Sequence, residues 1–244
     1  MQRLVEKVNA EGKRYGMAIN ASKTKTVVVS RKKEVPRVNI QINGTAIEQV
    51  KRFVYLGQTI TEDGKCDSAI RQRIEIARTV FMKMQDVLCS RKLNLDLRCR
   101  IWKCYIWSTL LYGVETWSLC KETERKLESF EMWCLRRMQR INWVMKISNK
   151  EVLNRANRER ELIKAVQKRK LVYAGHMMRG EGLQKLLLEG MIEGKRERGR
   201  QRTTWFDDIK KWTGLNYEEV RTRVQDRRRW RCIAANPTLR DGTT

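Results

Sequence analysis

The sequence predicts an α+β fold, in which a short N-terminal segment of helix and β-hairpin precedes a mostly α-helical bundle and a basic helical C-terminal region. Three observations predict this class. β-Branched and alternating runs are confined to the first 61 residues. Apolar residues recur at spacings of three and four from residue 70 onward, which is typical of helices. The only prolines, Pro36 and Pro237, lie near segment edges and leave room for long helices.

The first 61 residues are expected to hold one helix and several strands. Residues 2–15 carry apolar side chains at roughly helical spacing, and residues 26–30 form a β-branched run that is typical of a strand. The alternating runs "VNIQI" and "TAIEQV" meet at Asn43-Gly44, the strongest short-range signal for a β-hairpin. Residues 53–60, "FVYLGQTI", predict one more strand.

Residues 62–147 show helical periodicity instead, and Asp67 is the expected N-cap of the first helix. That helix is predicted to bury one stripe of side chains, namely Ile70, Ile74, Ala77, Phe81, Met84 and Leu88. A second helix is predicted from Leu97, Ile101, Tyr105 and residues 108–111. A third is predicted from Leu127, Phe130, Cys134, Met138 and Ile141. Three helices of this length can close a small bundle core.

Residues 148–244 continue as helices with a more basic surface. One predicted helix has an apolar face made by Leu162, Ile163, Val166, Tyr173 and Met177. Its opposite face is expected to expose Lys164, Lys168, Arg169 and Lys170. Residues 194–202, "GKRERGRQR", predict an exposed basic loop. Asn216 with Glu219 predicts a capping box for a last helix that ends in "RRRWR".

The charge of the chain predicts a polyanionic partner. With 53 Lys and Arg against 28 Asp and Glu, the formal net charge is +25, while 41% hydrophobic residues argue against a disordered polycation. Nucleic acid is the first expected partner. No run approaches the ~18 apolar residues of a membrane span, and no secretory signal opens the chain. We therefore predict no membrane partner and an intracellular location, in the nucleus or the cytoplasm.

The cysteines do not predict a metal site. The seven cysteines form no C-x-x-C pair, and the single histidine, His176, is far from them in the sequence. They are predicted to be small buried hydrophobic residues in a reducing compartment.

Several motifs of the chain occur together in one known family. The element G-x-x-x-N-x-x-K-T is present at Gly16, Asn20, Lys23 and Thr24. The sequence Y-L-G follows at Tyr55, Leu56 and Gly57. These resemble motif D and motif E, the primer grip, of reverse transcriptases from LINE-type (non-LTR) retrotransposons. The likeness continues through "LLYGVETWSL", "FEMWCLRRM", "GHMMR", "EGKRERGRQRTTWFDDIKKWTG" and "DRRRWR", and covers essentially the whole chain.

The resemblance implies three segments. Residues 1–61 would be the end of the palm, residues 62–147 a helical thumb that grips the template–primer duplex, and residues 148–244 a basic nucleic-acid-binding region. The hairpin with Tyr55, Leu56 and Gly57 would hold the 3′ end of the primer. Lys23 would be a possible general acid, in the parent enzyme only.

The resemblance also implies that the metal site of the parent enzyme is missing here. In the family, aspartates of motifs A and C hold Mg²⁺, and both motifs precede motif D. Only fifteen residues precede Gly16, and none is an aspartate. The chain is therefore expected to be a truncated fragment that is inactive as a polymerase, without a cofactor or small-molecule substrate. Residues 205–208, "WFDD", match an aromatic-x-Asp-Asp pattern in the wrong order, so we expect their acids in a helix first turn capped by Thr203 or Thr204.

Four basic clusters are the candidate phosphate contacts, with little sequence preference expected. Two lie on the first and third helices of the predicted thumb: Arg71, Arg73 and Arg78, and Arg136, Arg137 and Arg140. The other two lie nearer the C-terminus: Lys195, Arg196, Arg198, Arg200 and Arg202, and Arg227, Arg228, Arg229 and Arg231.

Two alternatives stay open at this point. The chain could be a stand-alone DNA- or RNA-binding protein that uses the same surface, or a structural helical module whose charge only keeps it soluble. His176 is expected to be a helix-end hydrogen-bonding residue. The tryptophans expected in the core are Trp102, Trp107, Trp117 and Trp133. Those that could either stack on bases or pack under the last helices are Trp205, Trp212 and Trp230.

Overall fold

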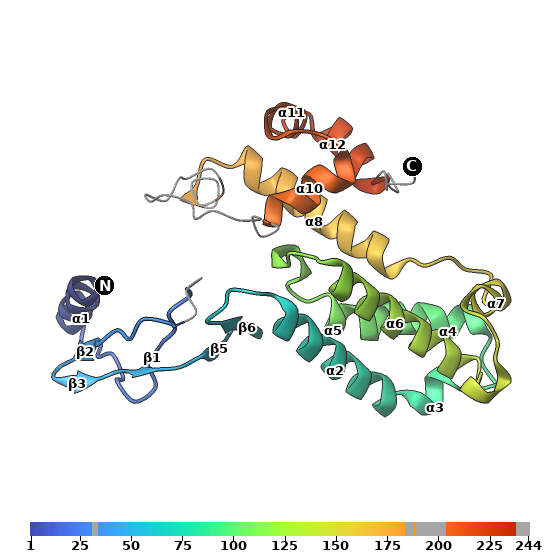
Figure 1. Cartoon of the computed structure of the whole chain (residues 1–244), viewed down its shortest axis with the longest axis horizontal. Helices are drawn as coiled ribbons and strands as arrows, with labels where there is room; N and C mark the ends of the chain where they lie inside the picture. Colours follow the sequence, from blue (N-terminus) through green and yellow to red (C-terminus); the bar gives the residue numbers. More distant parts are fainter. Residues whose placement is uncertain (31–33, 184–187, 189–203, 238–244) are drawn as a thin grey trace. The chain divides into compact units, whose positions relative to one another are not determined.

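The computed structural model describes residues 1–30, 34–183, 188 and 204–237. The chain divides into two compact units, Met1–Ala69 (the N-terminal unit) and Ile70–Thr244 (the helical unit). Among the described residues, the strands all belong to the N-terminal unit (Figure 1). The fold class is α+β, as predicted.

The N-terminal unit combines one helix with three two-stranded pairings. Its elements are α1 (Gln2–Arg14), β1 (Lys25–Thr26), β2 (Gln41–Ile42), β3 (Thr45–Ala46), β4 (Glu48–Gln49), β5 (Arg52–Tyr55) and β6 (Gln58–Thr61). β1 pairs in parallel with β4, whereas β2–β3 and β5–β6 are antiparallel. The small core consists of Ile40, Ile42 and Ile47, with Val5, Ile19 and Ala21 packed against it.

Both antiparallel pairs turn at two residues in the left-handed region. Asn43 (φ 49°) and Gly44 (φ 78°) join β2 to β3, which confirms the predicted hairpin. Leu56 (φ 47°) and Gly57 (φ 74°) join β5 to β6. The prediction of one strand over residues 53–60 is wrong, because this turn divides the segment into the hairpin that the resemblance implied. Of the strand predicted over residues 26–30, only β1 forms.

The helical unit is built around one central helix. Its first elements are α2 (Asp67–Lys83), α3 (Gln85–Leu88), α4 (Leu95–Trp102), η1 (Lys103–Trp107), α5 (Ser108–Leu110), η2 (Val114–Thr116) and α6 (Lys121–Met138). The later elements are η3 (Trp143–Met145), α7 (Asn149–Arg155), α8 (Leu162–Arg179), α10 (Trp205–Thr213), α11 (Tyr217–Arg223) and α12 (Arg227–Ala235). η2, α6, α10 and α12 all pack on α8 (Figure 1).

The stripe predicted for the third helix is confirmed, and that of the first helix is confirmed except at Met84, which is half-buried and lies between α2 and α3. α2 and α3 bury Ile70, Ile74, Ala77, Phe81 and Leu88. α6 and the residues that follow it bury Leu127, Phe130, Cys134, Met138 and Ile141. Asp67 is the first residue of α2 and lies in its first turn, and its role as the N-cap stays a prediction.

The face predicted for the second helix is wrong at Leu97 and Tyr105, whereas Leu110 and Leu111 are buried. α4 continues into the π-helix η1 and then into α5. A π turn adds a residue to the helical repeat, so the apolar face shifts around the helix axis. Tyr105, within the π turn, is exposed, as is Leu97 of α4, and the buried side chains are Cys99, Trp102, Ile106, Trp107, Leu110 and Leu111.

The last predicted helix is in fact two. Asn216 caps α11 and forms the predicted capping box with Glu219. α11 ends at Arg223, and a new helix, α12, begins at Arg227 with Asp226 as its N-cap. The Asp226 carboxylate accepts hydrogen bonds from the backbone of the second and third residues of α12, which separates the two helices.

Most of the tryptophans pack inside the helical unit. The buried ones are Trp102, Trp107, Trp117, Trp212 and Trp230. Trp133 and Trp205 are half-buried. Packing is therefore the structural role of Trp212 and Trp230, which the sequence left open. Within the described part of the chain, none of the helices has the length and apolarity to cross a lipid bilayer.

Candidate nucleic-acid interface

One arginine from each of the two predicted helix clusters lies on Trp133 of α6. The guanidinium carbon of Arg78 is 5.1 Å from the ring centroid, and that of Arg137 is 4.6 Å from it. Trp133 also packs edge-on against Phe81 of α2, with ring centroids 5.1 Å apart. Cation–π contacts of this kind hold both guanidinium groups close to the surface shared by α2 and α6.

Two other arginines of α6 and its C-terminal end bond to backbone carbonyls within the unit. Arg136 Nη2 donates to Ile147 O at 2.6 Å and to Asn149 Oδ1 at 3.0 Å. Arg140 donates to Cys89 O from Nε at 3.2 Å and from Nη2 at 3.0 Å. Both side chains tie loops to the end of α6. A contact with phosphate stays a prediction for them.

The remaining arginines of α2 face partners from later in the chain. Arg71 pairs with Glu122 at 3.5 Å, and Arg73 lies over the ring of Tyr112 at 4.4 Å. Lys126 and, more weakly, Arg71 hold the pKa of the Glu122 carboxyl below its usual value. Part of the positive charge of α2 is therefore balanced within the unit.

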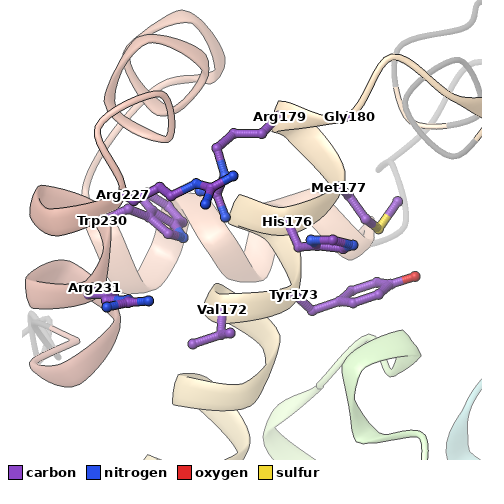
Figure 2. A pocket seen from close by; sticks show the side chains of 9 residues that line it. All are labelled: Val172, Tyr173, His176, Met177, Arg179, Gly180, Arg227, Trp230 and Arg231. Atoms are coloured by element: carbon purple, nitrogen blue, oxygen red, sulfur yellow. The ribbon is translucent and has the colours of Figure 1, made fainter.

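A hollow of about 750 Å³ lies between α8 and α12, and we call it the arginine hollow (Figure 2). Its lining consists of Val172, Tyr173, His176, Met177, Arg179, Gly180, Arg227, Trp230 and Arg231. Figure 2 shows Arg179 of α8 and Arg227 of α12 reaching toward one another. Tyr173 and His176 project from the side of α8 that faces away from α12 (Figure 2).

A glycine of α8 allows α12 to approach closely enough to form this hollow. A Cβ atom added to Gly175 would lie 2.2 Å from Trp230 Nε1, so no larger residue fits there without displacement. The indole is buried, and its Nε1 donates to Leu171 O at 2.8 Å. Arg227 and Arg231 are four residues apart, so one face of α12 carries both side chains.

The arginine hollow concentrates positive charge. None of the nine described residues that line it is acidic. Arg179 Nη1 donates to Val224 O at 2.9 Å, and desolvation together with repulsion from Arg227 and Arg231 lowers the pKa of Arg179. An anion bound between these side chains would relieve that repulsion.

The structure thus separates the arginines that the sequence grouped on α12. Arg227 and Arg231 line the hollow, whereas Arg228 and Arg229 do not. Arg229 pairs with Asp226 at 3.5 Å. Sequence reasoning missed Arg179, and it assigned His176 only a hydrogen-bonding role at a helix end. The one signal in the sequence was the glycine within the helical motif "GHMMR", since glycine costs about 1 kcal/mol in a helix and often marks close packing.

A second hollow, of about 710 Å³, lies between α8 and the segment from η1 to η2, and we call it the aromatic hollow. Its apolar part consists of Trp107, Leu111, Ala165, Val172 and Tyr173. Its polar part consists of Lys103, Glu115, Thr116, Lys168, Arg169 and His176. Val172, Tyr173 and His176 line both hollows.

Lys170 is fully buried, which corrects the prediction that it lies on the exposed face of its helix. Its Nζ lies 2.5 Å from Asp208 Oδ2 and donates to Trp117 O at 2.6 Å. Asp208 Oδ2 also accepts from Leu119 N at 3.0 Å. The rings of Trp205 and Trp212 flank the ammonium, with centroids 5.1 and 5.5 Å from Nζ.

Both aspartates of "WFDD" make contacts that stabilise the fold. Asp207 forms a capping box with Thr204 at the start of α10, and the backbone N–H of Thr204 lowers the pKa of the Asp207 carboxyl. Asp208 is held by Lys170 in the core. These carboxylates do not fit the Mg²⁺ site of a polymerase, because one caps a helix and the other is neutralised.

The described residues contain no group of three or more His, Cys, Asp or Glu side chains arranged to hold a metal ion. Cys99 and Cys134 are buried, as predicted, and burial raises the pKa of both thiols. Cys66 and Cys89 are half-buried, and Cys104, Cys120 and Cys232 are exposed, so the prediction of buried cysteines is wrong for the last three and only partly right for the first two.

In the N-terminal unit, the G-x-x-x-N-x-x-K-T element forms a turn that presents Lys23. Asn20 Oδ1 accepts from Lys23 N at 3.1 Å and from Ser22 Oγ at 2.7 Å. Asn20 O accepts from Thr24 Oγ1 at 2.8 Å. The Lys23 side chain is exposed. The Asn and Thr of this element therefore act on the backbone and leave the lysine side chain at the surface.

The Y-L-G residues form the tip of the β5–β6 hairpin. Tyr55 is 58% exposed and Leu56 is 72% exposed, next to the turn glycine Gly57. One predicted cluster, Lys195, Arg196, Arg198, Arg200 and Arg202, lies outside the described residues.

Two curated proteins show what the chain is similar to. It is 26% identical over 136 residues to the RNA-directed DNA polymerase from the mobile element jockey of Drosophila funebris, a match covering 54% of this chain and 15% of that polymerase. It is 26% identical over 239 residues to a transposon-derived protein of Caenorhabditis elegans, a match covering 93% of this chain and 79% of that protein. No family model and no solved structure matches the chain.

These similarities support a LINE-like retrotransposon origin for the chain. The matched region is a small part of the jockey polymerase, so the similarity alone does not assign polymerase activity to this chain. The relationship to a retrotransposon polymerase agrees with the resemblance that the motifs carry.

Proposed function

We propose that the chain is the C-terminal part of a LINE-type reverse transcriptase and that its function is to bind nucleic acid through the phosphate backbone. In this proposal, residues 1–61 correspond to the end of the palm with motif D and the primer grip. Residues 62–147 correspond to the thumb, and residues 148–244 form a basic nucleic-acid-binding region. The distant similarity to a retrotransposon polymerase supports this assignment.

The observation that carries the binding proposal is the arginine hollow. Three guanidinium groups from two helices gather there, and the lining residues that the structure describes include no acid. Arginine binds phosphate through two parallel N–H groups, and contacts of this kind carry no sequence information. The net charge of +25 adds long-range attraction for any polyanion.

Salt dependence tests this proposal directly. Each phosphate contact on a duplex contributes about −0.9 to the slope of log K against log salt. We expect Arg227→Gln/Arg231→Gln to flatten the slope by about two units, measured by anisotropy of a labelled duplex. The matched control is Arg91→Gln/Lys92→Gln, which removes the same charge from exposed residues that line neither hollow. Equal slopes for the two variants, or no binding by the wild type at about 50 mM salt, would favour a structural module instead.

The chain by itself is not proposed to polymerise. A reverse transcriptase needs a carboxylate pair for Mg²⁺. In the only aromatic-x-Asp-Asp sequence of this chain, Asp207 caps a helix and Asp208 forms a buried ion pair with Lys170. Lys23 is proposed as a general acid, and Tyr55, Leu56 and Gly57 as a primer grip, in the parent enzyme only. Nucleotide incorporation by purified chain with primer, template and Mg²⁺ would contradict this part of the proposal.

A further inference from the structure

We infer that the arginine hollow and the aromatic hollow form one groove along α8 that binds single-stranded nucleic acid, with the bases on its aromatic floor and the phosphates on its basic rims. This inference rests on the proposed function and names the strand state of the ligand. Val172, Tyr173 and His176 line both hollows, so the two adjoin each other at these residues of α8. The lining of α8 runs from residue 165 to residue 180, which is about 22 Å of helix.

The floor of the groove is suited to the faces of bases. Val172, which is 49% exposed although it is apolar, and the half-buried Tyr173 supply accessible aliphatic and ring surface, whereas Trp107 and Leu111 line the hollow as buried side chains. Tyr173 is held in place by an edge contact with Trp205, with ring centroids 6.3 Å apart. A fixed aromatic side chain loses little entropy when a base stacks on it.

The rims of the groove are cationic along its whole length. Lys168 and Arg169 border the aromatic hollow, and Arg179, Arg227 and Arg231 border the arginine hollow. Arg169 Nη1 donates to Leu111 O at 3.1 Å, which fixes the guanidinium beside the floor. Among the described residues of the two linings, Glu115 is the single acidic one. This charge arrangement is complementary to a strand that carries one phosphate per nucleotide.

The combination favours a single strand over a duplex. A duplex hides its base faces and presents only phosphates and groove edges, so an apolar floor would gain nothing from it. A single strand exposes both the bases and the backbone, and grooves that bind it pair stacking aromatic side chains with basic residues. About 22 Å of helix is enough for a few nucleotides, near the lower end of known site sizes of about 4–16.

The test compares single-stranded and duplex probes on the full chain. We would measure anisotropy of a labelled oligothymidylate of about 12 nucleotides, of an oligouridylate of the same length, and of the duplex form. Tyr173→Ala and His176→Ala should each weaken binding of the single strands by about 5- to 150-fold, the equivalent of about 1–3 kcal/mol of stacking per base, and leave duplex binding within about twofold. The two single-strand probes separate DNA from RNA as the source.

Tyr173→Phe keeps the ring and should bind as the wild type does, which separates loss of stacking from loss of folding. A stacking contact releases no counterion, so Tyr173→Ala should lower log K equally at every salt concentration without changing its slope.

The inference and the proposed function fail in different ways. If the duplex binds through Arg227 and Arg231 but single strands bind no better in wild type than in Tyr173→Ala and His176→Ala, the groove inference is overturned and the proposed function stands. If neither probe binds at about 50 mM salt, both are overturned. A polyglutamate peptide that displaces the oligonucleotide and is itself sensitive to Tyr173→Ala would assign the groove to an acidic protein segment and overturn the inference.

Discussion

Lys170 and Asp208 form a buried ion pair in the core of the helical unit. Both are almost fully buried, and Lys170 Nζ lies 2.5 Å from Asp208 Oδ2. Removing one partner leaves an uncompensated charge in the core, so Asp208→Ala should lower the free energy of unfolding of the helical unit by about 3–5 kcal/mol. The double variant Lys170→Met/Asp208→Ala removes both charges and should lie closer to the wild type. Urea denaturation measures both, and a double variant as unstable as the sum of the single changes would contradict the coupling.

Glu131 of α6 predicts a pH dependence. It is 1% exposed, and its Oε1 accepts from Glu161 N and Leu162 N, each at 2.9 Å. Burial raises the pKa of this carboxyl above its ordinary value of 4.5. The folded state then binds more protons than the unfolded state between the two pKa values, so the free energy of unfolding falls as pH rises through that interval.

Replacing Glu131 by glutamine removes the free-energy cost of ionising a buried carboxyl, and the glutamine oxygen still accepts from the two N–H groups. The stability of Glu131→Gln relative to the wild type should therefore increase as pH rises from about 4.5 and become constant above the folded pKa. Urea denaturation across a pH series measures the difference. A difference that does not change with pH would show that Glu131 does not titrate in this way.

At the scale of elements, the packing of α12 on α8 depends on Gly175. A Cβ added to Gly175 would lie 2.2 Å from Trp230 Nε1, whereas a Cβ on Gly180 would meet its nearest atom, Met177 O, at 3.5 Å. Gly175→Ala should therefore cost about 1–3 kcal/mol through overpacking and weaken nucleic-acid binding, because Arg227 and Arg231 would move with α12. Gly180→Ala is the control and should change stability by no more than about 0.5 kcal/mol. Equal effects of the two substitutions would contradict the role of the close approach.

Elements with a regular local pattern could be predicted from the sequence. The stripe of α6 and the Asn43-Gly44 turn follow from side-chain spacing and backbone preference alone. The exposed Tyr105 could not be predicted, because the π turn that rotates it outward is set by packing. Lys170 could not be predicted as buried either, since its partner Asp208 is 38 residues further along the chain.

The candidate site could be predicted only in part, because it too depends on contacts between residues that are far apart in the sequence. The sequence identified Arg227 and Arg231 as basic, but Arg179 joins them through the docking of one helix on another. The sequence also grouped Arg228 and Arg229 with them, and only the orientation of α12 separates these residues from the hollow. A sequence shows which residues are charged, but which charged side chains lie close together depends on how the helices pack.

At the scale of the whole molecule, the two units differ greatly in the core that each can build. The N-terminal unit rests on Ile40, Ile42 and Ile47, whereas the helical unit buries several tryptophans and the apolar faces of its long helices. A core in a segment of this size rarely supplies more than about 3–5 kcal/mol. We therefore expect the full chain to unfold in two steps, the N-terminal unit at lower urea concentration.

Substitutions confined to one unit test this expectation. Ile42→Val should lower only the first step, by about 0.5–1.5 kcal/mol, and Leu127→Ala should lower only the second, by about 2–5 kcal/mol. Both side chains are almost fully buried, at 2% and 0% exposure, so each change removes contacts from one core alone. Near-ultraviolet circular dichroism follows the second step, because the tryptophans belong to the helical unit. Amide hydrogen exchange of β2 and β3 follows the first. A single cooperative transition that shifts with either substitution would show that the two units fold as one.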